Sequence, residues 1–289
     1  MRNALTIDVE EYFHAENLRE AYPPEDWDRL ESRLEEPLER LLEILRERSV
    51  KATFFMLGWV AERRPALVPG LLAEGHEVAS HGYLHEPIWR LDRESLAADL
   101  EQAARAIALP PGTRLRGYRA PSFSVTPRTR WALEVLAAAG YEYDSSVFPI
   151  RHDRYGDPRA PIVPHDVHVG WGRRIVEAPP AVLRVLGRNL PVAGGGYLRL
   201  LPARLCGAGI ARLNARGAPA VVYLHPWELD TDQPRHEGVS FLRRLRHGIG
   251  SKRLAEKLER LLDRFTFTTL ESVLESHGFL EPPASRAAA

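Results

Sequence analysis

Short apolar runs alternate with longer amphipathic segments along most of this chain. The apolar runs are rich in β-branched and aromatic residues and cover 4–10, 51–57, 77–81, 115–121, 141–147, 219–226 and 265–270. Between them lie segments with the apolar spacing of helices, at 34–49, 65–75, 93–108, 126–140, 201–214 and 251–264. Repeated strand–helix units predict a parallel sheet, and seven or eight of them favour a barrel over an open sheet. The sequence therefore predicts an α/β fold, a deformed (β/α)7-8 barrel.

The length of 289 residues fits one barrel domain, which we expect to span 1–280. Residues 148–198 depart from the alternating pattern because they are rich in proline, glycine and histidine. We interpret them as an irregular insertion within that domain, with RIVEAPP (174–180) as a candidate short strand. The last residues, EPPASRAAA (281–289), are expected to form a disordered tail.

Charge, cysteine content and hydropathy exclude several classes of protein. The 39 basic and 39 acidic residues balance, so no net charge favours binding to nucleic acid or to an anionic membrane. The single cysteine, Cys206, excludes an intrachain disulfide and a thiolate zinc site, and we expect a small buried hydrophobe there. No apolar run approaches the ~18 residues of a membrane span. The start MRNALTIDVE lacks the apolar core of a signal peptide, which predicts a cytoplasmic protein.

Polar residues follow five of the predicted strands at their carboxyl ends. Catalytic groups of α/β barrels gather at this end, because the loops that follow the strands converge there. These residues are Asp8, Glu10 and Glu11, His81 and His85, Arg119, Pro121 and Ser122, Asp144, and His225, Trp227 and Glu228. We expect them to line one site.

Glu10, His81 and His85 have the composition of a divalent metal site. Two imidazoles and one carboxylate form a facial triad that leaves positions open for water and substrate. The His-x3-His spacing in SHGYLH is weak alone, because most such pairs bind no metal. Side chains alternate along a strand, so Asp8 and Glu10 point the same way while the residue between them points opposite. One carboxylate can therefore bind the metal while Asp8 accepts a proton from the attacking water.

Arg119, His225 and Asp144 complete a predicted acid–base system. We expect Arg119 to hold Asp8 ionised through a two-pronged ion pair, with a core-bridging arginine as the alternative. His225 is the candidate acid that protonates a leaving amine, and Asp144 is the candidate partner that orients it. Asp144 has a second interpretation as a turn cap with the two serines that follow it. Together these residues describe a metal-assisted amide hydrolase.

Four further residues are candidates for substrate contact. Trp227 is interpreted as a sugar-stacking residue or pocket wall, with a core position as the alternative, and Glu228 lies beside it. Ser122 follows the fourth strand, and His14 has either a role in substrate contact or no role. The remaining histidines are interpreted as surface or loop residues: His76, His152, His165, His168, His236, His247 and His277.

At these residues the sequence resembles the NodB-homology polysaccharide deacetylases, carbohydrate esterase family four. TIDVE stands at that family's aspartate-bearing first motif, and SHGYLH matches its His-x3-His metal motif. YRAPSFS resembles the third motif, YDSSVFP the fourth, and VVYLHP the last, which carries the catalytic histidine. The motifs stand in the family's order from residue 4 to about 280.

The resemblance implies a NodB-type barrel, a divalent metal of the Zn²⁺ type with Co²⁺ as an alternative, and removal of N-acetyl groups from a polysaccharide or its precursor. The roles implied are Asp8 as base, Glu10, His81 and His85 as metal ligands, His225 as acid, and backbone N–H groups near Ser122 in the oxyanion hole. The family's first motif has two adjacent aspartates, whereas Val9 and Glu10 follow Asp8 here. The metal carboxylate is therefore expected to reach from one residue further along.

More narrowly, DVEEYFH, GGGYLRLLP and HPWELDTDQPR resemble the subgroup found in bacterial exopolysaccharide-export loci. The leading hypothesis is a metal-dependent N-deacetylase whose partner is an N-acetylated saccharide. One alternative is a metal-optional hydrolase of a small cyclic amide, which would resemble the allantoinase-like branch. The other is a catalytically inert barrel that binds glycan. The oligomeric state is not specified by any pattern in the sequence.

Overall fold

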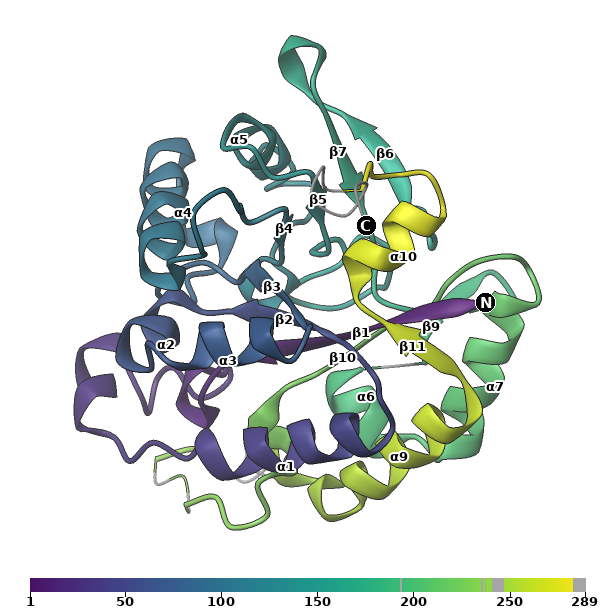
Figure 1. Ribbon diagram of the computed structural model, residues 1–289, viewed down its shortest axis with the longest axis horizontal. Helices are drawn as coiled ribbons and strands as arrows, with labels where there is room; N and C mark the ends of the chain where they lie inside the picture. The colour runs from purple at the N-terminus through teal and green to yellow at the C-terminus, as the bar shows by residue number, and fades with distance from the viewer. Residues whose placement is uncertain (193, 235, 237, 241–246, 283–289) are drawn as a thin grey trace.

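The computed structural model has one large curved sheet with helices around it (Figure 1), and it describes residues 1–192, 194–234, 236, 238–240 and 247–282. The sheet order is β10-β1-β2-β3-β4-β5-β7-β6, and β11 pairs with the first residues of β1. The strands of this sheet are β1 (Arg2–Val9), β2 (Thr53–Met56), β3 (Glu77–Ser80), β4 (Gly117–Tyr118), β5 (Tyr143–Asp144), β6 (His165–His168), β7 (Arg174–Glu177), β10 (Val221–Leu224) and β11 (Thr266–Thr268). Neighbours from β10 to β7 are parallel, and β6 is antiparallel to β7.

The two ends of the parallel series meet through the segment that follows β7. The backbone N–H of Ala178 donates to Asp144 O of β5 at 2.8 Å, and the N–H of Ala181 donates to Val221 O of β10 at 2.9 Å. This short bridge replaces a regular strand between β7 and β10. The predicted deformed α/β barrel is therefore confirmed, with its irregularity at this junction.

Helices follow most strands and cover the outside of the sheet (Figure 1). They are α1 (Glu35–Glu47), α2 (Gly58–Arg63), α3 (Leu67–Ala73), α4 (Arg93–Ile107), α5 (Ala132–Ala138), α6 (Gly195–Leu200), α7 (Ala203–Asn214), α9 (Leu254–Arg264) and α10 (Leu270–Ser276). Short 3-10 turns lie in the loops, at η1 (Tyr12–His14), η2 (Pro24–Arg29), η3 (Ile88–Arg90), η4 (Pro121–Phe123), η5 (Gly170–Gly172), η6 (Pro226–Leu229) and η7 (Ser251–Arg253). None of the helices in the described part of the chain has the length and hydropathy needed to cross a bilayer.

Side chains of β1 alternate between two environments. Leu5, Ile7 and Val9 are fully buried in the apolar cluster that includes the leucines of α1. The residues between them face the barrel interior, where Ala4 packs with Phe55. Because this alternation has a period of two, the interior side also receives the polar residues at even positions. The same strand thus supplies apolar packing outside and carboxylates inside.

Residues 148–198 contain two hairpins. One is β6–β7, and its strand β7 joins the main sheet, so the candidate strand at 174–180 is confirmed as Arg174–Glu177. The other pairs β8 (Val182–Val185) with β9 (Arg188–Pro191) outside the main sheet. The interpretation of this segment as an insertion in one domain stays a prediction. Of the predicted disordered tail, 283–289 lie outside the described residues.

Candidate active site and metal centre

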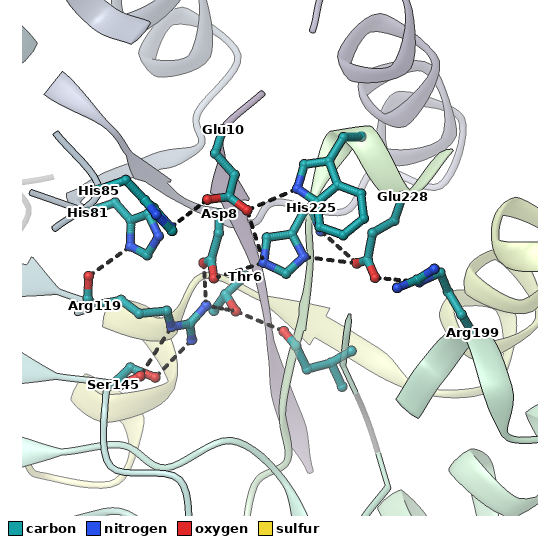
Figure 2. Close-up of polar contacts among 12 residues, drawn as sticks. Thr6, Asp8, Glu10, His81, His85, Arg119, Ser145, Arg199, His225 and Glu228 are labelled. Atoms are coloured by element: carbon teal, nitrogen blue, oxygen red, sulfur yellow. Dashed lines mark hydrogen bonds and ion pairs between the residues drawn. The ribbon is translucent and has the colours of Figure 1, made fainter. Parts of the chain in front are cut away.

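A cavity of about 520 Å³ opens at the carboxyl ends of the strands. Five of the predicted catalytic and metal-binding residues line it from three segments, the ends of β1, β3 and β10, namely Asp8, Glu10, His81, His85 and His225. Figure 2 shows that their polar groups converge, with His225 between the two carboxylates and the buried Glu228. The strand-end rule therefore brought the expected side chains together in space.

Glu10, His81 and His85 form a compact cluster whose candidate ligand atoms all lie within 4.8 Å of one another. All three side chains are buried. His81 Nδ1 lies 2.8 Å from the carbonyl oxygen of Arg119, which can only accept, so Nδ1 carries the proton and Nε2 keeps its lone pair. Burial lowers the pKa of His81 to about 4, which keeps the imidazole neutral. The cluster has the donor set of a divalent metal site.

Glu10, the third member of the cluster, has one carboxylate oxygen that faces the histidines. Glu10 Oε2 has no hydrogen-bond partner among the described residues, and it lies 2.7 Å from His85 Nε2. Burial would raise the pKa of Glu10, but the charges of His85 and His225 outweigh it and hold the pKa far below its usual range. A buried carboxylate oxygen beside two imidazoles fits a cation. The residues present therefore fit the metal that the sequence predicts.

The loop between the two histidines is held from α4. Asp99 accepts hydrogen bonds from the backbone N–H of Tyr83 at 3.0 Å and of Leu84 at 3.5 Å. Gly82 has a φ of +76°, and a Cβ there would lie 2.8 Å from Asp99 Oδ2. Glycine is needed at this position both for its left-handed backbone and for the close approach of the carboxylate. The turn sets the separation of the two imidazoles.

Arg119 pairs with Asp8, but through one nitrogen. Its Nη1 donates to Asp8 Oδ1 at 2.6 Å and to Thr6 Oγ1 at 2.8 Å, while Nε and Nη2 donate to Ser145. The expected two-pronged ion pair is therefore wrong, because the other edge of the guanidinium is held by the serine. Arg119 is fully buried, and its guanidinium lies 4.1 Å from the ring centroid of Phe55. It fixes Asp8 from inside the barrel.

His225 is oriented by Glu228 and not by Asp144. Glu228 Oε2 accepts from Nδ1 and from the backbone N–H of His225, both at 3.0 Å, and Arg199 Nε donates to Oε1 at 2.7 Å. Burial lowers the pKa of His225, but the charges of Glu228, Glu10 and Asp8 outweigh it and raise the pKa to about 9. His225 Nε2 then faces Asp8 and Glu10 at 3.7 and 3.6 Å.

These contacts also correct the role expected for Glu228. Burial opposes its ionisation, but Arg199 and His225 lower the pKa of Glu228 to about 2. The side chain is fully buried, and the two oxygens are taken by His225 and Arg199. The sequence suggested that Glu228 contacts the substrate. Glu228 instead contacts His225, the candidate acid.

Asp144 belongs to a separate buried pair. Its oxygens accept from Oγ and N of Ser146 at 2.5 and 3.1 Å, and its carboxyl is hydrogen-bonded to Glu177 on the neighbouring strand β7. Burial raises the pKa of both carboxyls, and the charge of Asp144 raises that of Glu177 further. The turn-cap interpretation fits these contacts. The expected contact with His225 is wrong, because Asp144 points to β7 instead.

Trp227 lies in the cavity wall and is only 7% exposed. Its Nε1 donates to Glu10 Oε1 at 2.9 Å. The rings of His225 and His247 stack on the indole, with centroids 5.0 and 4.3 Å away and interplanar angles of 23° and 9°. A pocket wall is thus supported, but little of the ring surface is left for a sugar.

His14 lies behind the cluster. It is 2% exposed and packs against the indole of Trp27, with ring centroids 4.3 Å apart, and against Trp59. It is not among the described residues that line the cavity. Its assignment to substrate contact is therefore wrong, because η1 turns the side chain into the core and away from the cavity.

Ser122 lines the cavity as expected, on η4 after β4. Its φ of +57° places it in the left-handed region, and Phe123 has a φ of +51°. Two successive non-glycine residues in this region are uncommon. The loop is anchored beneath by Ser146, whose Oγ accepts from the backbone N–H of Ala120 at 2.7 Å.

Several residues of the site escaped sequence reasoning. Arg199 of α6 and His247 are buried at the site, and Trp89, Tyr155 and Tyr197 line the cavity. The remaining histidines are interpreted from the sequence as surface or loop residues, but His76, His236 and His247 are at most 5% exposed, and of these three only His76 and His236 lie outside helices and strands. One signal was available for Glu228, since His225-Pro-Trp-Glu228 has the spacing and the proline of a capped turn, which η6 forms.

Two family models match this chain. Residues 27–143 match the family model for polysaccharide deacetylase, and residues 145–275 match that of a domain of unknown function, DUF3473. The chain is 38% identical to a chitooligosaccharide deacetylase of Sinorhizobium fredii over 82 residues, which are 28% of this chain and 38% of that protein. The matched segment therefore covers well under half of that relative.

Solved structures share the fold over nearly the whole chain. A structure described as a polysaccharide deacetylase from Mycobacterium smegmatis is 22% identical, covers 98% of this chain and 93% of its own, and has a TM-score of 0.59. Puue allantoinase is 15% identical, with coverage of 97% and 91% and a TM-score of 0.61. At these identities the likeness concerns the fold alone.

Proposed function

We infer that this chain, whose residues 27–143 match the polysaccharide deacetylase family model, is a metal-dependent hydrolase that removes N-acetyl groups from a saccharide and releases acetate. The observation that carries this proposal is the placement of Asp8 and His225 on one cavity with the cluster of Glu10, His81 and His85. A hydrolase of this kind needs a base for water, an acid for the amine and a cation for the carbonyl oxygen. Side chains suited to the first two requirements, and candidate ligands for the third, lie within a few ångströms of one another.

Glu10, His81 and His85 would hold the divalent metal, which when bound would supply a Lewis acid for the acetyl carbonyl and lower the pKa of water. Asp8 accepts the proton of the attacking water, and Arg119 holds its Oδ1 so that Oδ2 faces the cavity. His225 donates its Nε2 proton to the leaving nitrogen as the C–N bond breaks. The products are acetate and the free amine of the sugar.

Two imidazoles and one carboxylate favour Zn²⁺ as the metal, and Co²⁺ accepts the same ligands. Backbone N–H groups near Ser122 are proposed to contribute to the oxyanion site, since this loop lines the cavity. The association with exopolysaccharide assembly stays a prediction from the sequence motifs.

The shape of the site favours a saccharide over a small cyclic amide. A second cavity of about 400 Å³ adjoins the first, and both are lined by Glu16, Asn17 and Arg154. Together the two adjoining cavities, which we call the trough, are larger than a single small amide needs. Trp89, 37% exposed at the rim, offers the flat apolar face on which sugar rings pack. An inert glycan-binding barrel is disfavoured, because binding alone needs no acid–base pair.

The direct test is acetate release from N-acetylated chitooligosaccharides by the purified protein, before and after chelation. We expect chelation to abolish the release and Zn²⁺ or Co²⁺ to restore it, while Glu10→Ala and His225→Ala lose it. Cyclic ureides are assayed in parallel. Full activity of a metal-free preparation would contradict the proposal, and so would turnover of ureides without turnover of N-acetyl sugars. Glycan binding without acetate release, unchanged in both variants, would favour the inert barrel.

A further inference from the structure

The indole of Trp227 is the only described side chain that gives a hydrogen bond to Glu10, apart from the histidines around it. Nε1 donates to Oε1 at 2.9 Å, and both side chains are buried. This bond distinguishes the two carboxylate oxygens, because Oε1 accepts from the indole while Oε2 lies beside His85.

The uncommitted oxygen is the one that faces the histidines. Oε2 has no hydrogen-bond partner among the described residues, and it lies 2.7 Å from His85 Nε2. A glutamate has one more rotatable bond than an aspartate, so its carboxylate needs an additional restraint to reach a fixed position. Outer contacts of this kind orient metal ligands and raise metal affinity. The indole N–H supplies such a restraint from the far side of the carboxylate.

We propose that Trp227 is a positioning residue that holds Glu10 as a single-oxygen metal ligand. This inference rests on the proposed metal centre and extends it to a residue outside the ligand set. Val9 and Glu10 follow Asp8, so the ligand reaches in from one residue past the end of β1. Trp227 compensates for that longer reach.

The indole is itself held in place. Its ring is stacked by His225 and His247, and the guanidinium of Arg199 lies 5.5 Å from its centroid. The backbone carbonyl of Trp227 accepts from Gln233 Nε2 at 2.5 Å, and Gln233 Oε1 lies 2.8 Å from His247 Nε2. Because the same ring supports His225, Trp227 also sets the spacing between the acid and the metal carboxylate, which are 3.6 Å apart.

The test measures Zn²⁺ affinity without substrate, by titration against a chromophoric chelator of known affinity. We expect Trp227→Phe, which keeps a stackable ring but lacks the N–H, to raise the Kd for Zn²⁺ by about 10- to 100-fold. Trp89→Phe is the matched control, because Trp89 lines the same cavity without contacting Glu10, and its Kd should not change. Equal Zn²⁺ affinity of Trp227→Phe and the unaltered protein would overturn the inference.

A double-mutant cycle separates positioning from a structural role. In a Glu10→Ala background the remaining Co²⁺ affinity should not respond to Trp227→Phe, because the residue acts through the carboxylate. If Trp227→Phe weakens Co²⁺ binding equally in both backgrounds, the effect is structural and the inference fails. If either result contradicts the inference while the unaltered protein still releases acetate, the proposed function remains supported. An unaltered protein that binds no Zn²⁺ would overturn both.

Discussion

Glu228 Oε2 lies 3.0 Å from Nδ1 of His225 and, because Glu228 is ionised, accepts a hydrogen bond from the N–H of this nitrogen. The pair orients the protonated ring and leaves Nε2–H directed at the cavity, where it faces Asp8 and Glu10. Arg199 closes the other side of Glu228 and keeps it charged. The candidate acid is therefore supported by a residue three positions further along the chain.

Replacement of Glu228 by glutamine should lower kcat by about 100-fold with little change in KM. The amide keeps the volume and one acceptor, but it removes the charge that keeps His225 protonated, and a general acid contributes on this scale. Steady-state acetate release measures the effect. Asp144→Asn is the control, because Asp144 does not contact His225, and its kcat should fall much less. A larger loss of kcat in a folded Asp144→Asn variant would contradict the assignment.

The metal cluster could be predicted from sequence because its determinants are local. Glu10 follows a strand whose alternation is visible in TIDVE, and the two histidines follow another strand in SHGYLH. The rule that parallel strands present their carboxyl ends at one edge is enough to bring such residues together. The barrel itself was predictable for the same reason, since each strand–helix unit carries its own apolar pattern.

The side chains that contact these residues are set by tertiary packing, which no sequence pattern indicates. Asp144 was a reasonable partner for His225, but the pairing of β5 with β7 places Glu177 opposite it and takes up its carboxyl. His247 and Arg199 reach the site from segments with no strand-end signal. The contacts of Arg119 could not be predicted for the same reason. Ser145 accepts hydrogen bonds from Nε and Nη2 of the guanidinium, so that edge is not available to Asp8.

Truncation of Trp89 tests the trough. Trp89→Ala should raise KM for an N-acetylated tetrasaccharide by about tenfold, the loss of one stacking contact, and leave kcat nearly unchanged. The same substitution should not alter the KM for a monosaccharide amide, because Trp89 lies at the rim of the cavity and its neighbour Arg90 lines the second one. Equal effects on substrates of both lengths would show that the trough does not bind the adjoining sugars.

Ser122 tests the loop that borders the proposed oxyanion site. Ser122→Gly should retain nearly full kcat, because glycine adopts the φ of +57° without strain and keeps the backbone N–H. Ser122→Val should lower both kcat and stability, the latter by about 1–2 kcal/mol, because a β-branched residue is strained in this region. Acetate release and urea unfolding measure the two effects. A valine variant as active and stable as the glycine variant would contradict this account.

Glu77, at the end of the barrel opposite the cavity, should make the stability of the protein depend on pH. This buried carboxyl at the start of β3 lies 2.5 Å from Tyr143 Oη and accepts from Thr53 Oγ1 and from the N–H of Glu271. Burial raises its pKa to about 7, and the charge of Glu271 contributes to the shift. The folded state therefore binds a proton more tightly than the unfolded state, in which the pKa is near 4.5.

The free energy of unfolding should be largest below about pH 4.5, as far as this group is concerned, and should fall as the pH rises from 4.5 to about 7. The shift corresponds to on the order of 3 kcal/mol. Glu77→Gln mimics the protonated acid, since its amide can donate to Tyr143 while its oxygen accepts from Thr53. Its unfolding free energy, measured in urea at pH 5 and pH 8, should change less than that of the unaltered protein. The same decrease in both proteins would mean that Glu77 is ionised in the fold at pH 5, and the origin of the dependence would lie elsewhere.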